Sequence, residues 1–467
     1  MSTSIIFSDQ LPPAPARIFF IGLGGIGMSA LAQLLVHLGY KVGGSDRGLN
    51  EPARQQLFSQ LSAQGISVYP QDGSGPREFA PDAMLLSAAI EAGNADLEAA
   101  PGVPCIHRAT AMALAFRQLG IPQIAVAGSC GKTSVTGWIA SALRALGKRV
   151  LMVNGGYTLE FESDAAPGNF HADKNPEYIV AEIDESDRSI NVCNPDYGAV
   201  LNVGDDHYSM EELQQVFGAF LGRCRKGAVV PADLTALLPA DAASPATFAP
   251  AASGYSSSRE GISFSPAPGI TAESQLSGRH NAVNGSAVWT ILKSIFPEAD
   301  GGTLAAALRP YRGVRQRFET MRNAGEGIPA VINDYAHNPE KIAAAVETAR
   351  ERFGSPLDVV FQPHGYGPLG FMREGLAHNL LQALHPGDRF IFLPVYYAGG
   401  TTSFKPTSQE VAESFRTMGI NAFAAESRDE AVEMLQERCA GAWLILGARD
   451  PSLREWTKEI SASPWHA

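Results

Sequence analysis

The chain has 467 residues, of which 45% are hydrophobic and 18% are charged, and its formal net charge is −12. This is the composition of an ordinary globular protein, and the length suggests three domains. The acidic balance excludes a general nucleic-acid or anionic-membrane surface, because such partners need basic patches. Since no apolar run approaches the roughly 18 residues that a membrane-spanning helix needs, we expect no membrane insertion.

The cysteines are scattered and form no CxxC pair: Cys105, Cys130, Cys193, Cys224 and Cys439. Such a dispersed, odd-numbered set predicts neither a disulfide framework nor a thiolate zinc site, and it fits a reducing compartment. The first residues also lack the basic segment and apolar core of a secretory signal. We therefore expect a cytoplasmic protein, and the sequence carries no indication of an oligomeric state.

The N-terminal segment has the pattern of a Rossmann-like βαβ unit. A predicted strand at Arg17–Ile21 leads into the glycine turn Gly22–Gly27, a helix follows from Met28 to about Leu38, and a second strand ends at Asp46. A GxGxxG turn with an acidic residue about 20 positions later is typical of dinucleotide binding, which would indicate NAD chemistry. The same turn would cradle the diphosphate of any nucleotide-linked ligand, so this segment leaves both interpretations open.

A second unit begins at the apolar strand Ile124–Ala127, which leads into the loop Gly128-Ser129-Cys130-Gly131-Lys132-Thr133 and a helix to about Leu146. Such a loop can wrap an oxyanion, because its amides meet the positive end of the following helix. Lys132 can reach the β- and γ-phosphates of a nucleotide, and the Thr133 hydroxyl suits Mg²⁺. The candidate backbone contacts are Gly128, Ser129 and Gly131.

The loop departs from the full GxxxxGK[ST] pattern, because Val126 stands where the first glycine belongs. The alternative is therefore a plain glycine turn with a surface lysine. The buried strand before the loop and the helix after it favour the phosphate-binding interpretation. Further strands predicted in this unit are Val150–Val153, Tyr178–Ile183 and Tyr197–Val203.

Two polar segments follow strands of this second unit. Glu182 opens the run from 182 to 187, and His207 closes the run Asn202-Val203-Gly204-Asp205-Asp206-His207. Ligands collect at the carboxyl ends of strands in open α/β sheets, so we expect Glu182 and His207 to bind Mg²⁺ beside Thr133. Either cluster alone could be a solvated turn, but a shared edge with the phosphate loop favours the metal site.

The segment from Pro231 to Ser277 is rich in Ala, Pro, Ser and Gly. It is either a flexible linker or a set of short strands in a side sheet, and composition alone leaves both open. A third α/β unit starts near Met321. Its predicted elements are the strands Ala330–Asn333, Leu357–Gln362, Arg389–Pro394 and Trp443–Gly447 and the helix Pro339–Arg352.

Further candidate ligand-binding residues lie before and within this third unit. Arg317 belongs to the cationic segment RGVRQRF at 312–318, which is either a solvated helix end or a phosphate-neutralising group. The segment from Asn333 to Pro339 joins a strand to a helix at a ligand-facing edge. His364 follows the next strand and is either a core histidine or a functional one.

Taken in order, these segments resemble the Mur ligase family, which also includes the folylpolyglutamate synthetases. The resemblance covers nearly the whole chain and rests on IGLGGIGMS, the GxxGKT loop, AEIDESD, NVGDDH, GRHNAVN, RGVRQRFE, NDYAHNP and FQPH. The glycine-rich opening, the SAAI segment at Ser87–Ile90 and RGVRQRFE are most similar to the family's alanine-adding branch and its murein-peptide-recycling relative.

The resemblance implies an α/β fold of three domains. An N-terminal Rossmann-like domain (1–119) would bind a UDP sugar, and a central domain (120–320), with a P-loop ATPase-like parallel sheet and a small side sheet, would bind ATP. A C-terminal Rossmann-like domain (321–467) would bind the amino acid. In such enzymes the γ-phosphate passes to the substrate carboxylate, and an amine attacks the resulting acyl phosphate. No nicotinamide is then required, and the pathway would be peptidoglycan synthesis.

The resemblance also implies a role for individual residues. Lys132, His207 and Arg317 would be catalytic, and Thr133, Glu182 and His207 would bind Mg²⁺. Further ATP contacts would be Asn281, Arg317 and Asp334. The substrate contacts would be Gly24, Gly25, Ile26, Gly27, Asp46, Ser87, His337, Asn338 and His364.

Several positions depart from the alanine-adding pattern, and most lie near the expected amino-acid site. Cys130 replaces a histidine and Gly204 an acidic residue, while Asn333 and Asn338 stand in NDYAHNP where that branch has DDYAHHP. After FQPH, the branch carries two arginines suited to a carboxylate, and this chain has Gly365 and Pro368; a later glutamate is Gly400. The replacement cation could be Arg373 or Arg449.

Four functions therefore compete. The chain is a UDP-muramate:amino-acid ligase, a recycling ligase or paralogue with another acceptor, an ATP-binding regulatory protein without acceptor binding, or an NAD-dependent oxidoreductase. The last leaves the GKT loop, Glu182 and His207 unexplained. Activation of a carboxylate by ATP accounts for all of these motifs. The sequence does not determine which amino acid or peptide is the acceptor.

Overall fold

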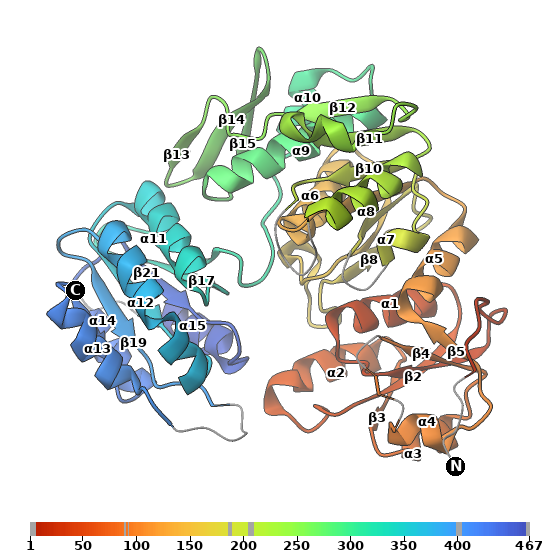
Figure 1. Cartoon of the computed structure of the whole chain (residues 1–467), viewed down its shortest axis with the longest axis horizontal. Helices are drawn as coiled ribbons and strands as arrows, with labels where there is room; N and C mark the ends of the chain where they lie inside the picture. The colour runs from red at the N-terminus through yellow and green to blue at the C-terminus, as the bar shows by residue number, and fades with distance from the viewer. Residues whose placement is uncertain are drawn as a thin grey trace. The chain divides into compact units, whose positions relative to one another are not determined.

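The computed structural model describes residues 6–87, 90–91, 93–184, 189–203, 210–397 and 404–463 (Figure 1). The chain divides into two compact units. The first comprises Met1–Tyr255, Ser263–Gln275 and Arg279–Val314, and the second comprises Ser256–Ile262, Leu276–Gly278 and Arg315–Ala467. None of the described helices has the length and apolar composition needed to cross a bilayer.

The first unit opens with a five-stranded parallel sheet of order β3-β2-β1-β4-β5, which confirms the predicted Rossmann-like unit. Its strands are β1 (Arg17–Ile21), β2 (Lys41–Asp46), β3 (Ser67–Pro70), β4 (Ala83–Leu86) and β5 (Cys105–His107). The helices are α1 (Ile26–His37), η1 (Pro52–Arg54), α2 (Gln55–Ala63), α3 (Ser74–Phe79), α4 (Ala95–Ala99) and α5 (Arg108–Leu119). Helix α1 begins at Ile26, so Gly27 lies in its first turn and not in the preceding loop as predicted.

The same unit holds a seven-stranded sheet of order β12-β11-β10-β6-β9-β7-β8, parallel except where β8 meets β7. Its strands are β6 (Gln123–Ala127), β7 (Val150–Val153), β8 (Phe170–Ala172), β9 (Tyr178–Glu182), β10 (Tyr197–Val200), β11 (Gly227–Pro231) and β12 (Pro245–Phe248). The helices are α6 (Lys132–Ala145), η2 (Leu159–Phe161), α7 (Ser189–Val192), α8 (Met210–Gly222), η3 (Ala232–Leu237), α9 (Arg279–Ile295) and α10 (Gly301–Ala306).

Residues 231–277 form η3 and several short strands, so the side-sheet alternative is confirmed and the flexible-linker alternative is wrong. Beyond β12, the strands β13 (Ser256–Ser258), β14 (Gly261–Ala267) and β15 (Ile270–Ser274) make a three-stranded sheet. Small and polar residues suit these strands because most of their positions are exposed or only partly buried. The buried side chains include Ile262, Phe264 and Ala272.

The second unit is built on a six-stranded sheet of order β16-β17-β21-β18-β19-β20, parallel except for the edge strand β16. The strands are β16 (Glu319–Arg322), β17 (Ala330–Asp334), β18 (Leu357–Phe361), β19 (Arg389–Phe392), β20 (Ala422–Ala424) and β21 (Ala442–Leu446). The helices are α11 (Pro339–Phe353), α12 (Tyr366–Ala383), α13 (Ser408–Thr417), α14 (Arg428–Gln436) and α15 (Ser452–Ala462). The four strands predicted here are confirmed, whereas β16 and β20 were not predicted.

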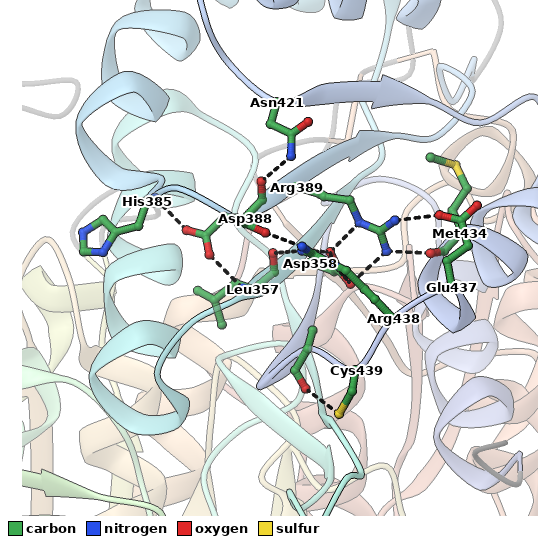
Figure 2. A network of polar contacts seen from close by, with 12 residues as sticks. Leu357, Asp358, His385, Asp388, Arg389, Asn421, Met434, Glu437, Arg438 and Cys439 are labelled. Atoms are coloured by element: carbon green, nitrogen blue, oxygen red, sulfur yellow. Dashed lines mark hydrogen bonds and ion pairs between the residues drawn. The ribbon is translucent and has the colours of Figure 1, made fainter. Parts of the chain in front are cut away.

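A buried ionic network ties together the start of β18 and β19 (Figure 2). Asp358 is fully buried, and its carboxylate accepts hydrogen bonds from Arg389 Nε at 2.8 Å and Nη2 at 3.1 Å and from Arg438 Nη2 at 2.5 Å. Arg389 also donates to Glu437 Oε2 at 2.9 Å. Because each of these charges is paired with an opposite charge through hydrogen bonds, we assign the network a role in holding the sheet together and not in binding a ligand.

Candidate active site

The loop between β6 and α6 has the geometry of a phosphate cradle. Gly128 and Gly131 have φ angles of 127° and 87°, a backbone conformation that residues with a side chain rarely adopt. A Cβ at Gly128 would lie 3.0 Å from the carbonyl oxygen of Asn202, and a Cβ at Gly131 would lie 2.9 Å from Asn284 Oδ1. Both glycines are therefore required by backbone shape and by close approach, which supports a built loop over a generic turn.

Asn202 clamps this loop from the neighbouring strand end. Its Oδ1 accepts from the Cys130 N–H at 2.8 Å, and its Nδ2 donates to the Cys130 carbonyl at 2.9 Å. The Ser129 N–H donates to the Asn202 carbonyl at 3.2 Å. Strand β10 ends at Val200, earlier than the predicted Val203, which leaves Asn202 free to turn toward the loop. The sequence placed Asn202 in a polar segment but did not identify this role.

Helix α6 is anchored at the opposite side by an aromatic pair. Trp138 is fully buried, stacks on Tyr311 with ring centroids 5.3 Å apart, and donates its indole N–H to the Leu308 carbonyl at 2.8 Å. A fixed helix fixes the direction of its first amides, so the anion-binding end of α6 is held rigidly.

Lys132, at the first position of α6, lies beside an acidic strand end. Its Nζ is 3.7 Å from Asp184 Oδ1, and only 13% of its side chain is exposed. The ammonium therefore lies at the N-terminus of a helix, where an anion bound by the loop amides would be within its electrostatic reach. Asp184 was part of the acidic segment identified in the sequence, although Glu182 was the predicted site residue.

Glu182 is the last residue of β9 and faces Thr133. Its Oε2 accepts from the Gly155 N–H at 2.8 Å, and its carboxylate is hydrogen-bonded to the Thr133 hydroxyl. Burial raises the pKa of Glu182, against the opposing effects of these hydrogen bonds and of Lys132. A Cβ at Gly155 would lie 2.5 Å from Oε2, so the chain makes room for the carboxylate here.

The pair formed by Thr133 and Glu182 fits Mg²⁺, because a hydroxyl and a carboxylate oxygen next to a phosphate loop are hard oxygen ligands. His207, the third predicted ligand, lies outside the described residues, as does Gly204. Within the described ranges, no group of three or more His, Cys, Asp or Glu side chains is arranged to hold a metal by itself. The remaining ligands of such a site would be phosphate oxygens and water.

Asn281, a predicted ATP contact, lies in the first turn of α9. It is buried on α9, and its Oδ1 accepts from Asn284 Nδ2 at 3.3 Å. Asn284 is the residue that approaches the loop at Gly131. Asn281 stays a predicted ATP contact, and Asn284, three residues further along α9, is an additional candidate.

A cavity of about 720 Å³ lies between the first sheet and the end of β9. The predicted substrate residues that line it are Gly25, Ile26, Gly27, Asp46 and Ser87, together with Glu182. Gly24, also predicted, does not line this cavity, and its N–H donates to Asp46 Oδ2 at 2.7 Å. Asp46 also accepts from the Gly48 N–H at 2.8 Å and from Arg54, so it organises the glycine turn as well as facing the cavity.

Arg108, which the sequence reasoning missed, occupies the wall of this cavity at the start of α5. A Cβ at Gly27 would collide with its guanidinium, so the absence of a side chain at 27 makes space for it. Burial lowers the pKa of Arg108, while the carboxylates of Asp184 and Glu182 oppose that shift. A guanidinium that faces two acids and a helix N-terminus is suited to hold an anionic ligand between them.

Asn169 holds the two sheets of the first unit together next to the cavity. It is fully buried, and its Nδ2 donates to the Ile26 carbonyl at 2.8 Å and to Ser29 Oγ at 2.9 Å. Its Oδ1 accepts from Gln33 Nε2 at 3.0 Å. This network fixes the start of α1 relative to the central sheet, which gives the cavity a defined shape.

In the second unit, Arg317 sits on a strained backbone. The residues on either side, Gln316 and Phe318, have positive φ angles of 56° and 48°. The Phe318 N–H donates to Asp334 Oδ2 at 2.6 Å, and the Tyr335 N–H donates to the Gln316 carbonyl at 2.8 Å. Such strain is maintained only where the surroundings enforce it, and it is typical of functional segments.

Asp334 and its neighbours gather at the end of β17. Burial raises the pKa of Asp334, and backbone hydrogen bonds and the charge of Arg317 oppose the shift. His337 Nδ1 lies 2.9 Å from the Tyr335 carbonyl. Asn338 caps α11 by accepting from the Lys341 N–H at 2.9 Å, so its side chain has a structural role as well as the predicted substrate role.

His364 follows β18 and stacks edge-on against His337, with ring centroids 5.3 Å apart. Its Nδ1 is buried and has no hydrogen-bond partner in the described part of the chain. Burial, with the charges of His337 and Arg449, lowers the pKa of His364. Gly365 precedes α12 with a φ of 132°, and Pro368 lies in its first turn. Gly400 lies outside the described residues.

Three family models match successive parts of the chain, and all three describe Mur ligase domains. Residues 17–119 match the model described as Mur ligase family, catalytic domain; 126–292 match the Mur ligase middle domain; and 316–449 match the Mur ligase, glutamate ligase domain.

The similar proteins cover almost the whole chain. The UDP-N-acetylmuramate–L-alanine ligase of Streptomyces avermitilis is 32% identical over 94% of this chain and 96% of its own length; that of Acidithiobacillus ferrooxidans is 32% identical over 92% and 95%. Among solved structures, the UDP-N-acetylmuramate-alanine ligase of Thermotoga maritima is 26% identical with a TM-score of 0.77, covering 96% of this chain and 100% of its own. A murein peptide ligase from Psychrobacter arcticus, 18% identical with a TM-score of 0.57 over 96% and 99%, shares the fold.

Proposed function

The chain belongs to the Mur ligase family and is an ATP-dependent ligase; on that premise we propose that it joins the carboxylate of a UDP-N-acetylmuramate-type nucleotide sugar to an amino acid in peptidoglycan synthesis. The observation that supports this most directly is the arrangement at one sheet edge of Lys132, Asp184 and the Thr133–Glu182 pair. Glu182 and Asp184 of this group also line the cavity to which the glycine turn and Arg108 contribute. The three-domain division at 119 and 320 remains part of the proposal.

The phosphate loop would hold ATP. Backbone amides of Gly128–Gly131 and the N-terminus of α6 would bind the β- and γ-phosphates, and Lys132 would neutralise charge that develops on the transferring phosphoryl group. Thr133 and Glu182 would hold Mg²⁺, with His207 as the predicted further ligand. The bound ion would withdraw charge from the phosphate oxygens.

The nucleotide sugar would lie in the 720 Å³ cavity. The amides of Gly25–Gly27 at the start of α1 suit its diphosphate, and Arg108 suits an anionic group beside Glu182 and Asp184. A substrate carboxylate oxygen would attack the γ-phosphorus and release ADP. The amine would then attack the carbonyl of the acyl phosphate, releasing phosphate and a proton.

The acceptor would bind at the strand ends of the second unit, around His337 and His364. L-alanine or a similar amino acid is the primary proposal. Because Gly365 and Pro368 replace two cations, a different amino acid or a murein peptide is the second, and Arg449 is a candidate carboxylate partner, because its charge acts on His364. If the protein uses no acceptor, the remaining alternative is an ATP-binding protein that does not catalyse ligation.

The test is phosphate release from ATP with Mg²⁺ and UDP-N-acetylmuramate across a panel of amino acids and murein peptides. Release stimulated by one acceptor supports the proposal and names that acceptor. Lys132→Ala should abolish acceptor-dependent ADP release, whereas the exposed Lys41→Ala should retain it. Near-normal turnover in Lys132→Ala, or no release with any acceptor, would overturn the proposed function.

A further inference from the structure

A second cavity, of about 440 Å³, lies in the first unit between α5 and α7; we refer to it as the α5–α7 cavity. Its walls come from α5, from α7 and the residues after it, and from the segment before β11. The volume falls within the range of small-molecule sites. It is separate from the 720 Å³ cavity, although Met112 and Ser189 line both.

The α5–α7 cavity combines an apolar wall with a cationic rim. The apolar side includes Met112, Phe116, Ile121 and Val192. Among its described lining residues, the charged ones are Arg117, Arg225, Lys226 and Asp196, which gives a net charge of +2. This excess stands out in a chain whose net charge is −12.

The rim is organised before any ligand binds. Asp196 accepts from Arg225 Nη2 at 2.8 Å, lies 3.3 Å from Lys226 Nζ, and also accepts from the Gln123 N–H at 3.0 Å. The carboxylate is nearly buried, with 8% of its side chain exposed, while Arg225 and Lys226 are 61% and 52% exposed. Asp196 therefore fixes the two cations and leaves them accessible to an anion.

The wall of this cavity is connected to the phosphate loop by hydrogen bonds. Ser189 Oγ accepts from the Asp184 N–H at 2.9 Å and donates to the Asp184 carbonyl at 2.8 Å. Asp184 in turn lies 3.7 Å from Lys132 Nζ. The other end of α7 is held by Arg223, which donates to the carbonyls of Ile190 and Cys193. These bonds connect α7 through Asp184 to Lys132, so a displacement of α7 would be transmitted to Asp184.

We propose that the α5–α7 cavity binds a small organic anion with an apolar body and thereby changes the affinity of the phosphate loop for ATP. The anionic group binds at Arg117, Arg225 and Lys226, and the apolar body packs against Phe116 and Val192. The coupling runs through Ser189 and Asp184. Thermodynamic linkage requires that ATP alter the affinity for the anion by the same factor.

The test uses anilinonaphthalene sulfonate, an apolar body with one anionic group, titrated into the full chain by calorimetry. We expect one saturable site whose affinity falls by about tenfold or more in Ala113→Trp, which fills the cavity, and in Arg117→Glu, which reverses a rim charge. Lys41→Glu makes the same charge change at an exposed residue outside the lining and should leave the affinity unchanged.

To measure the coupling, the probe is titrated in the presence of saturating ATP, and ATP is titrated in the presence of saturating probe. We expect reciprocal changes in Kd of about fivefold, lost in Ser189→Ala while probe binding is retained. Equal probe affinity in Ala113→Trp, Arg117→Glu and the unmodified chain would show that the site is not this cavity. Unchanged ATP affinity with the probe bound would overturn the coupling. Because the assay measures binding alone, its result is independent of whether the proposed ligase substrates are correct.

Discussion

Asn202 and Cys130 exchange two hydrogen bonds, with the Cys130 N–H donating to Asn202 Oδ1 at 2.8 Å and Asn202 Nδ2 donating to the Cys130 carbonyl at 2.9 Å. The amide side chain thus fastens the tip of the phosphate loop to the end of β10. The loop lacks the first glycine of the full Walker pattern, and this clamp is one means by which its shape is fixed.

Replacing Asn202 with Ala should weaken ATP binding by up to about thirtyfold, because the two hydrogen bonds to Cys130 contribute roughly 1 kcal/mol each. Asn202→Asp should be worse, since the second carboxylate oxygen faces the Cys130 carbonyl and adds negative charge near the phosphates. Calorimetric titration with ATP measures both. The control is Asn421→Ala, which removes a 2.8 Å bond to the Asp388 carbonyl in the other unit and should leave ATP affinity unchanged. Unaltered ATP affinity in Asn202→Ala would refute the clamp.

Gly155→Ala should displace Glu182 and raise the Mg²⁺ concentration needed for half-maximal activity by about tenfold or more. The added Cβ would lie 2.5 Å from Glu182 Oε2, and a metal ligand moved by a fraction of an ångström loses affinity. Activity measured against Mg²⁺ concentration provides the readout. Gly93→Ala is the matched control, because its Cβ would meet nothing within 4 Å. An identical Mg²⁺ dependence in the two variants would argue against Glu182 as a ligand.

The cysteines should differ sharply in their reaction with an alkylating reagent at pH 8. Cys130 and Cys439 are exposed and should react, whereas burial raises the pKa of Cys193 and of Cys224 to about 12, so both remain neutral thiols. ATP should protect Cys130, which lies in the phosphate loop, and leave Cys439 unprotected. Mass spectrometry of labelled peptides measures each site. Equal labelling of Cys130 with and without ATP would contradict nucleotide binding at this loop.

The same raised pKa values predict a loss of stability in alkali. The unfolded thiols ionise near their ordinary pKa, while the folded ones stay protonated, so the folded state binds more protons between about pH 9 and 12. The free energy of unfolding should therefore fall as pH rises through this window, and it should fall less in Cys224→Ala. Urea unfolding at several pH values measures the effect. An equal slope in the variant and in the unmodified chain would count against this assignment.

Asp358→Asn should destabilise the second unit by about 3–5 kcal/mol, because it removes the buried carboxylate that Arg389 and Arg438 share and leaves Arg389 with Glu437 alone (Figure 2). Arg309→Met, which breaks the exposed pair with Glu273, should cost less than about 1 kcal/mol. Urea unfolding compares the two. Similar small losses in both variants would show that burial of Asp358 does not give the network its strength.

Much of the fold and the position of the candidate phosphate loop were predictable from local patterns. The strand–glycine–helix spacing identified β1, β6, α6 and the loop at Gly128–Thr133, because a tight turn around an anion requires particular residues at consecutive positions. The start of α1 was misplaced by two residues, since a glycine in a first helical turn has the same sequence signature as a glycine in the loop. Composition also could not distinguish a linker from the strands β13–β15, which bury few side chains.

The sequence by itself predicted ATP-dependent activation of a carboxylate, because the phosphate-loop, acidic and arginine motifs are each one continuous segment whose residue types suit a particular ligand. Only the tertiary structure decided which isolated residues complete the site. Asn202 reaches the loop because β10 lies beside β6, and Asp184 reaches Lys132 because β9 lies on its other side. Arg108 enters the cavity because Gly27 has no side chain. Such contacts depend on strand order and on space between distant segments, which no spacing along the chain records.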